Sequence, residues 1–254
     1  MNGAAFLSAE GISKAYPAVK VLQDVSLSVA RGDSFAVIGP NGAGKTTLFK
    51  VLSGELFADA GRVTFEGQDV SAMPAWQRVR MGFGRTFQVA RVFPDLTAED
   101  NAIIAAEAAV RGRRQGPSLA WWPSRQVREM AKAALDEVSL FNQRGTLARF
   151  LSYGDRKRLE LAFSLVLRPR LLMLDEPTAG MSPADRAAAV QLIARLKERH
   201  DMTVVLTEHD MGVVFGLANR VAVLNHGQVV TVGTPAEVRA NPTVRDIYLG
   251  SGHA

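Results

Sequence analysis

Short apolar runs separated by turns dominate the first part of the chain. The stretch up to Asp33 alternates β-type segments with turns and ends in a strand over residues 25–30, which predicts a small antiparallel sheet. Residues 34–38 then form a compact apolar strand, followed by a glycine-rich loop and a helix that runs to about Leu52. The order of strand, loop and helix predicts the start of an α/β domain.

A long helical segment follows. From Thr97 to about Leu167 the pattern is almost wholly helical: Thr97 can cap a helix with Asp100 three residues on, and residues 130–138 carry apolar side chains at helical spacing. Within this segment, residues 111–124 hold two glycines and two prolines among charges and paired tryptophans, which predicts a loop or a break between helices. We therefore predict a helical subdomain inserted in an α/β domain.

Strands and helices alternate again from Leu171. We predict strands over residues 171–174 and 203–207 and helices over 184–197 and 211–218, an alternation typical of a parallel sheet covered by helices. Two further strands, 221–224 and 229–232, flank the hairpin signal Asn225-His226-Gly227-Gln228. A last helix is predicted to start at Thr234, with Pro235 in its first turn and Glu237 at the reciprocal capping position.

Composition narrows the class of protein. The 254 residues are 47% hydrophobic, enough to bury an ordinary core, and the absence of cysteine excludes a disulfide framework, a Cys-ligated zinc and a thiol nucleophile. The start, MNGAAFLSAE, lacks the pattern of a secretory signal, and no apolar run approaches the roughly 18 residues of a membrane helix. Because the 30 Lys and Arg are spread among 25 acids, we expect a mixed solvated surface and no nucleic acid partner.

The loop "GPNGAGKTT" carries the clearest chemistry. It matches G-x-x-x-x-G-K-[ST] between a predicted strand and a predicted helix, as a phosphate loop (P-loop) requires; the alternative is an ordinary glycine-rich turn. Its glycines let backbone N–H groups point inward, Lys45 supplies charge to the β and γ phosphates, and the Thr46 hydroxyl can bind Mg²⁺. The predicted nucleotide-binding residues of this loop are Gly39, Pro40, Asn41, Gly42, Ala43, Gly44, Lys45, Thr46 and Thr47.

Two acids follow a second apolar strand. In "LLMLDEPTAG", Asp175 and Glu176 come where open α/β sheets bind ligands, at the carboxyl ends of strands. Asp175 suits Mg²⁺, directly or through water, and Glu176 would face the γ-phosphate and polarise the attacking water. The alternative is a solvated acidic turn before Pro177, which is less compatible with the P-loop upstream.

Two neutral polar residues complete the pattern. Gln88, in "RTFQ", can contact Mg²⁺ and the attacking water, because an amide both donates and accepts hydrogen bonds. His209, in "LTEHD", directly follows a predicted strand at the same sheet edge and can hydrogen-bond the γ-phosphate. A lone Gln or His is more often structural, so these two predictions depend on the other motifs.

The P-loop, Gln88, "LSYGD", Asp175-Glu176 and His209, in this order, resemble the nucleotide-binding subunit of ABC transporters over essentially the whole chain. The resemblance implies ATP and Mg²⁺ as cofactors and two ATPase subunits packed head to tail. It implies that Ser152 and Gly154 address the γ-phosphate held by the partner's P-loop, and that Tyr16 stacks on adenine. Tyr16 could equally be an ordinary strand residue.

Finer motifs indicate a subfamily. "GRTFQ", "LTAEDN", "LDEPTAGMSP", "EHDMGVVFGLANRVAVLNHG" and the terminal "YLG" look like the ATPases of branched-chain amino acid importers and their relatives for amides and urea. That likeness implies a subunit at the cytoplasmic face of the bacterial inner membrane. It would power uptake through separate permease subunits, with a second copy or a sister ATPase as partner and a periplasmic solute-binding protein as an indirect partner.

The same resemblance implies the fold. We expect an α/β P-loop NTPase (RecA-like) core with an N-terminal antiparallel β subdomain and an inserted α-helical subdomain. The expected division gives residues 1–88 and 168–225 to the nucleotide-binding core and β subdomain, 89–167 to the helical subdomain, and 226–254 to a C-terminal hairpin and helix.

Three residues depart from the general ABC pattern. Tyr153 replaces a signature glycine and Asp155 the usual glutamine, two changes that also occur in the importer group. Ser182 stands where an Asp usually follows the second acidic motif, and its position before Pro183 suits a helix cap. Other ABC ATPases, for lipid export or for work on DNA or ribosomes, remain alternatives, whereas a GTPase-like switch would need an N-K-x-D motif that this sequence lacks.

Overall fold

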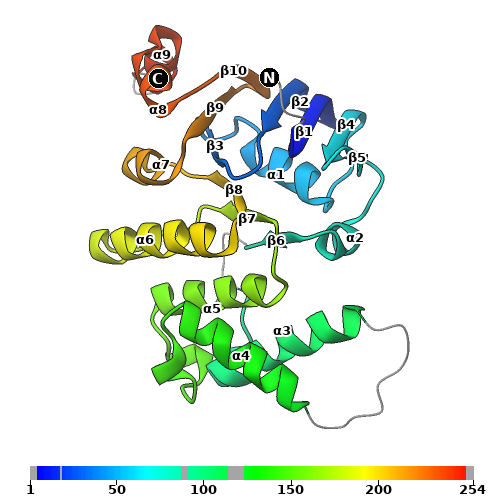
Figure 1. Cartoon of the computed structure of the whole chain (residues 1–254). Helices are drawn as coiled ribbons and strands as arrows, with labels where there is room; N and C mark the ends of the chain where they lie inside the picture. The colour runs from blue at the N-terminus through cyan, green and yellow to red at the C-terminus, as the bar shows by residue number, and fades with distance from the viewer. Residues whose placement is uncertain (1–4, 18, 87–90, 114–122, 250–254) are drawn as a thin grey trace.

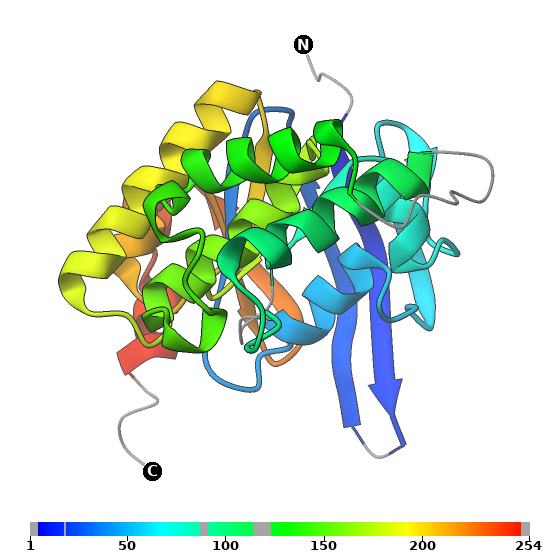
Figure 2. The same ribbon diagram turned by 90° about the horizontal axis from the view of Figure 1, so that it is seen from below.

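The computed structural model describes residues 5–17, 19–86, 91–113 and 123–249. Two sheets lie together in one half of the molecule, and a group of helices, α3, α4 and α5, lies at the opposite end from the C-terminal helices α8 and α9 (Figure 1). Seen from below, α3, α4 and α5 lie in front of the strands, and the paired β1 and β2 extend past these helices (Figure 2).

The first sheet is antiparallel, as predicted. Its strand order is β2-β1-β4-β5. The strands are β1 (Leu7–Tyr16), β2 (Val19–Val29), β4 (Ala60–Phe65) and β5 (Gln68–Asp69). The sheet is wider than the sequence pattern predicts, because β4 and β5 come from a part of the chain between Leu52 and Thr97 for which no element was predicted.

The second sheet carries the predicted parallel strands, in the order β10-β9-β3-β8-β7-β6. Its strands are β3 (Ser34–Ile38), β6 (Phe83–Arg85), β7 (Leu171–Asp175), β8 (Thr203–Thr207), β9 (Arg220–Asn225) and β10 (Gln228–Gly233). Strands β3, β8 and β7 are neighbours and run parallel. The segments that follow them, with the P-loop, His209 and Glu176, therefore meet at one edge of the sheet.

Alternation along the buried strands divides the apolar interior in two. Leu171 and Met173 of β7 belong to a core that includes Leu48 and Phe49 of α1 (Lys45–Ser53). Leu172 and Leu174 belong to a second core, which includes Leu159 of α5. Side chains of a strand point alternately to the two faces of a sheet, so a fully apolar strand is covered on both sides. Helices α6 (Pro183–His200) and α7 (Met211–Leu217) lie close to their predicted bounds.

The helical segment consists of α3 (Ala98–Arg113), α4 (Arg125–Glu137) and α5 (Tyr153–Val166), with two short 3₁₀ turns between α4 and α5. Thr97 caps α3 as predicted: its Oγ1 accepts from Asp100 N at 3.0 Å and donates to the Asp100 carboxylate at 2.6 Å. Residues 111–113, where a loop or a break between helices was predicted, instead belong to α3, which continues through Arg113. Residues 114–122 of that predicted loop lie outside the described residues.

The C-terminal hairpin is confirmed, but the last helix is two helices, α8 (Pro235–Ala240) and α9 (Pro242–Leu249). Thr234 and Glu237 form the predicted capping box. Asn241 breaks the helix with an extended conformation, because the ring of Pro242 disfavours helical dihedrals in the residue before it. Helix α2 (Ala75–Arg80) precedes β6. Among the described residues, every helix is too short or too polar to cross a membrane.

Candidate functional site

The P-loop follows β3 and packs closely against β9 and β2. At Gly39, φ is 153° and an added Cβ would lie 2.0 Å from the Leu224 carbonyl oxygen; at Gly44, φ is 103° and a Cβ would lie 2.8 Å from Val21 O. Only glycine fits such close approach with these dihedrals. The loop is therefore wedged between β9 and β2, which fixes the direction of its backbone.

The turn between β9 and β10 supports the loop from outside. His226 and Gly227 both have positive φ, of 46° and 76°, as a two-residue hairpin turn requires. Gly227 N–H donates to the Ala43 carbonyl at 3.0 Å, while Gln23 N–H donates to Gly227 O at 2.8 Å. The C-terminal hairpin thus connects the P-loop to β2.

Lys45 begins α1 and folds back over the loop. Its ammonium donates to the carbonyls of Gly39 at 2.8 Å and Pro40 at 3.0 Å, and the residue is only 7% exposed. Burial lowers the pKa of Lys45, an effect opposed by the carboxylates of Glu176 and Asp175. The predicted phosphate-binding charge and both predicted acids therefore lie close enough to interact electrostatically. Thr46, which directly follows Lys45 in the sequence, is exposed.

Asp175 ends β7 in a buried position, 6% exposed. One carboxylate oxygen accepts a hydrogen bond from Thr207 Oγ1 at 2.8 Å, and the other lies 3.5 Å from an Arg85 Nη atom. Neither Thr207 nor Arg85 was singled out from the sequence. Both hold the carboxylate that was predicted to bind Mg²⁺.

Glu176 has a strained backbone and a histidine partner. Its φ is 48°, in the left-handed region that is uncommon for residues other than glycine and is often found at functional sites. Its N–H donates to Thr207 Oγ1 at 3.1 Å and to Thr207 O at 3.2 Å. The Glu176 Oε1 atom lies 2.7 Å from His209 Nε2. The structure thus brings together Glu176 and His209, two predicted site residues that are 33 positions apart in the sequence.

Glu208 is a buried acid that the sequence analysis passed over, although it stands in the same "LTEHD" motif as His209. It is 3% exposed. Its carboxylate accepts from Thr178 N at 3.0 Å, from Thr178 Oγ1 at 2.6 Å and from His209 N at 3.1 Å. Glu208 therefore fixes the turn after Glu176 to the end of β8, a role that its place between a strand and a candidate histidine could have suggested.

The "LSYGD" motif forms the N-terminus of α5. Ser152 is the N-cap: its Oγ accepts from Asp155 N at 3.1 Å and donates to the Asp155 carboxylate at 2.9 Å. Gln143 also donates to that carboxylate, at 3.4 Å. An added Cβ at Gly154 would meet nothing closer than 4.0 Å, so the backbone there is open to approach. Backbone N–H groups at an open helix N-terminus are a surface that favours an anion.

Three other predicted residues have different outcomes. Tyr16 ends β1 and is 47% exposed, so its ring is accessible. Gln88 lies outside the described residues. Ser182 caps α6, accepting from Asp185 N at 3.2 Å with Pro183 in the first turn, which confirms the predicted cap.

The polar groups at this edge fit a magnesium ion. The described residues contain no cluster of three or more His, Cys, Asp or Glu that could hold a metal. Mg²⁺ in phosphate sites usually takes one or two carboxylates and completes its shell with phosphate oxygens and water. Asp175 with the Thr46 hydroxyl therefore provides a donor set suited to Mg²⁺ bound together with a nucleotide.

Comparison with known proteins agrees with these motifs. Residues 22–179 match the family model described as "ABC transporter", and residues 228–254 match the one described as "Branched-chain amino acid ATP-binding cassette transporter".

Two relatives carry related names. The chain is 35% identical over 249 residues, 96% of its length and 97% of the relative's, to the high-affinity branched-chain amino acid transport ATP-binding protein LivG of Salmonella typhimurium. It is 36% identical to the lipopolysaccharide export system ATP-binding protein LptB of Acidithiobacillus ferridurans, over 96% of each chain.

Solved structures share the fold. The chain superimposes on the ADP conformation of an ATP-binding cassette of an ABC transporter with a TM-score of 0.86 at 29% identity, covering 98% of this chain and 100% of the other. A nucleotide-free cassette gives a TM-score of 0.85, also at 29% identity, over 96% and 98% of the two chains.

Proposed function

This chain belongs to the ABC transporter family of ATP-binding subunits, and from that premise we propose that it powers uptake of branched-chain amino acids or related solutes through separate permease subunits. As a member of this family it is an ATPase. The observation that carries the choice of solute class is the match of its C-terminal residues, 228–254, to the branched-chain amino acid transporter model.

We assign the chemistry to groups that lie at or after the ends of β3 and β7, together with Gln88, which lies outside the described residues. Lys45 and the P-loop backbone would hold the β and γ phosphates, and Asp175 with Thr46 and Gln88 would hold Mg²⁺, which would neutralise charge on the phosphates. Glu176 would take the proton of the attacking water. Its hydrogen bond to His209 supports this role, because a base must be held in one orientation to act.

We propose that a second ATPase subunit completes each site. Ser152 and Gly154 would then address the nucleotide on the partner's P-loop, while Tyr16 would stack on the adenine within its own chain. The support is the open, exposed N-terminus of α5, whose capping hydrogen bonds stay within its first turn. A second copy of this chain or a sister ATPase would serve equally well.

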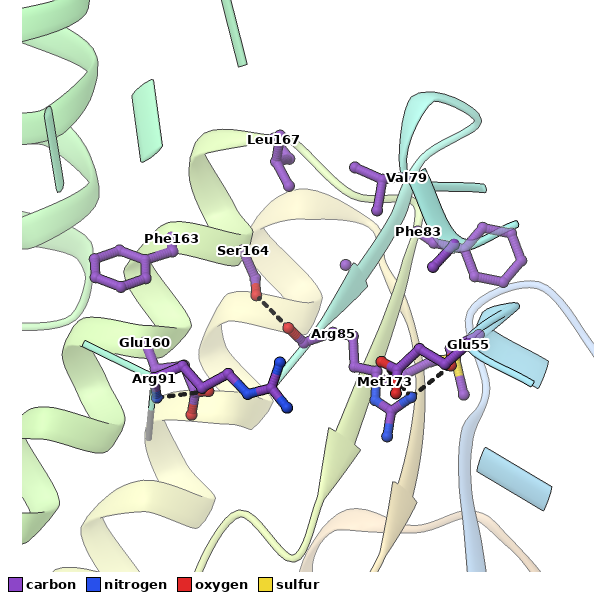
Figure 3. Close-up of a pocket in the computed structure, with 13 residues that line it drawn as sticks. Glu55, Val79, Phe83, Arg85, Arg91, Glu160, Phe163, Ser164, Leu167 and Met173 are labelled. Carbon is purple, nitrogen blue, oxygen red and sulfur yellow. Dashed lines mark hydrogen bonds and ion pairs between the residues drawn. The ribbon is translucent and has the colours of Figure 1, made fainter. Parts of the chain in front are cut away.

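We propose that the permease contacts a groove between the nucleotide core and the helical segment. The groove encloses about 250 Å³ and its lining is mainly apolar, with Phe83, Phe163 and Met173 among the side chains (Figure 3). Arg91 N donates to the Glu160 carboxylate at 3.4 Å at one end. An apolar groove with charged residues at its edge suits an amphipathic helix of a partner.

Each part of the chain has a proposed role in the transporter. Residues 89–167 would act as the helical subdomain, residues 1–88 and 168–225 as the nucleotide core and β subdomain, and residues 226–254 as the C-terminal element. The subunit would lie at the cytoplasmic face of the inner membrane, held there by its permease, with the periplasmic solute-binding protein as an indirect partner.

Uptake of labelled leucine tests the solute class. Proteoliposomes containing the assembled transporter, loaded with MgATP, should accumulate leucine, and transporter with the Glu176→Gln chain should not. The exposed Glu129→Gln variant is the matched control, because it makes the same change on α4, away from the site. The 36% identity to a lipopolysaccharide export ATPase favours lipid export as the second candidate, and lipid-stimulated ATPase activity without leucine uptake would select it.

A further inference from the structure

One arginine connects the proposed permease groove with the proposed magnesium site. Arg85 is the last residue of β6, the edge strand that lines the groove, and its side chain is only 9% exposed. In the parallel pair with β7 it stands opposite Met173. Asp175, two residues on, therefore lies on the same face of the sheet as Met173 and within reach of the Arg85 guanidinium.

The guanidinium lies between two carboxylates. One Nη atom lies 2.8 Å from Glu55 Oε1, and the other lies 3.5 Å from Asp175 Oδ2. The first Nη atom also donates to Ser53 Oγ. Figure 3 shows the side chain directed toward Glu55 while the backbone carbonyl of Arg85 faces Ser164 of α5.

These partners have defined places in the fold. Ser53 is the last residue of α1, the helix that begins at the P-loop with Lys45, and Glu55 comes two residues later on the wall of the groove. A cation at the C-terminal end of a helix is favoured by the helix dipole. Arg85 thus joins the far end of the P-loop helix to the carboxylate at the end of β7.

The neighbouring Arg78 shows what an arginine used only for structure looks like. It is fully buried and donates to backbone carbonyls alone, among them Val51 O at 2.9 Å and Leu52 O at 2.6 Å. Burial lowers its pKa to about 10. Arg85, in contrast, contacts two carboxylates, one of which belongs to the predicted metal site.

We propose that Arg85 is a positioning residue for Mg²⁺: it orients the Asp175 carboxylate, together with the Thr207 hydroxyl, and ties that carboxylate to the groove wall at Glu55. The proposal deepens the proposed function and rests on it for the identity of the groove's occupant. A partner that moves the Glu55 wall would act on Mg²⁺ through this one side chain. Residues outside the coordination shell that orient a metal-binding side chain commonly change metal affinity about 10- to 100-fold when removed.

The test is Mg²⁺ binding by the isolated chain with ADP as the probe nucleotide. Calorimetric titrations of ADP over a series of Mg²⁺ concentrations give the Mg²⁺ concentration at half effect, and Arg85→Gln should raise it roughly 10-fold while ADP binding in EDTA stays near wild type. Arg62→Gln is the matched control, because it removes an exposed arginine paired with Asp69. An unchanged or lower half-effective Mg²⁺ concentration in Arg85→Gln would overturn the proposal.

Two further variants separate positioning from general support of the fold. Arg85→Lys keeps the charge but cannot span both carboxylates, so it should restore only part of the Mg²⁺ affinity; full restoration would overturn the bridging role. In an Asp175→Asn background, Arg85→Gln should raise the half-effective Mg²⁺ concentration no further, because Arg85 acts through Asp175. Additive effects would overturn the proposal. Since these measurements need no permease, they can fail while leucine uptake succeeds, and the reverse.

Discussion

The P-loop end and the "LSYGD" end of the molecule are built in different ways. At the P-loop end, Lys45 and Asp175 are both buried. Asp175 accepts a hydrogen bond from Thr207, and the loop that Lys45 folds over is supported by Gly227, so both are held by segments far away in the sequence. At the other end, Ser152 bonds within its own helical turn, and the adjacent Phe150 is 71% exposed. The first half of the proposed site is completed by folding, whereas the proposed second half is presented outward, as a surface that acts on another molecule would be.

The largest effect on ATP hydrolysis should come from Glu176, the proposed general base. Glu176→Gln should slow ATP hydrolysis by about 10²- to 10⁴-fold, because an amide cannot accept the proton of the attacking water. ATP binding should persist, since the shape of the side chain is kept. Steady-state ATPase assays of the assembled transporter measure this, with Glu129→Gln as the control. Near wild-type turnover would show that Glu176 is not the base.

Removal of the Lys45 charge, which is proposed to bind the phosphates, should have the next largest effect. Lys45→Ala should weaken ATP binding about 10- to 100-fold, because it removes charge-assisted hydrogen bonds made in the ground state as well as in the transition state. Calorimetry measures the affinity, and Lys50→Ala, an exposed lysine on the same helix, is the control. Equal ATP affinity in Lys45→Ala and wild type would contradict the assignment.

Mixing two inactive variants tests the comparison directly. A Lys45→Ala chain has a defective P-loop and an intact α5 N-terminus, and a Ser152→Arg chain has the reverse. If the two halves come from different chains, a mixed dimer has one intact site, and an equal mixture should recover up to roughly a quarter of the wild-type ATPase activity.

The mixing experiment needs proof that mixed dimers form, which crosslinking of differently tagged chains provides. Ser28→Arg, on the exposed edge of β2, controls for the added charge. If the transporter requires a sister ATPase, one substitution is made in this chain and the other at the equivalent position of the sister ATPase. Mixed dimers without activity above the single variants would mean that each site is made within one chain.

The smallest effect on ATP hydrolysis is expected at Tyr16, because its ring would hold the base and not the reacting phosphate. Stacking of a purine on an aromatic ring contributes about 1–3 kcal/mol and does not read the base edge. Tyr16→Ala should therefore weaken ATP and GTP by the same factor, while Tyr16→Phe should bind both like wild type, and GTP should support some hydrolysis. Competition between GTP and bound ATP analogue measures this. Complete failure of GTP to compete would contradict simple stacking.

Local patterns predicted much of the fold, because many elements are marked by residues next to one another in sequence. The strands at 34–38 and 203–207 and the caps at Thr97, Ser182 and Thr234 are of this kind. No helix or strand was predicted within residues 53–96, where β5 and β6 are only two and three residues long and take their structure from neighbouring strands.

The same physical reason limits the prediction of the site. The P-loop and the Asp175-Glu176 pair form recognisable local motifs. Arg85 and Thr207 also stand in quoted motifs, "GRTFQ" and "LTEHD", but nothing in those motifs indicates their contacts with Asp175. Their importance comes from contacts over long separations, such as the one between Thr207 and Asp175. The half of the site that folding completes is therefore the half whose supporting residues are hardest to predict.

The hydrogen bond between Gly227 N–H and the Ala43 carbonyl has a thermodynamic consequence. Opening of the C-terminal hairpin removes a support of the P-loop, so opening and nucleotide binding must oppose each other by the same coupling free energy. Nucleotide should accordingly slow hydrogen exchange at the Gly227 amide, although that amide does not belong to the loop. The hydrogen-exchange rate of the Gly227 amide in the C-terminal hairpin therefore reports whether nucleotide is bound at the P-loop.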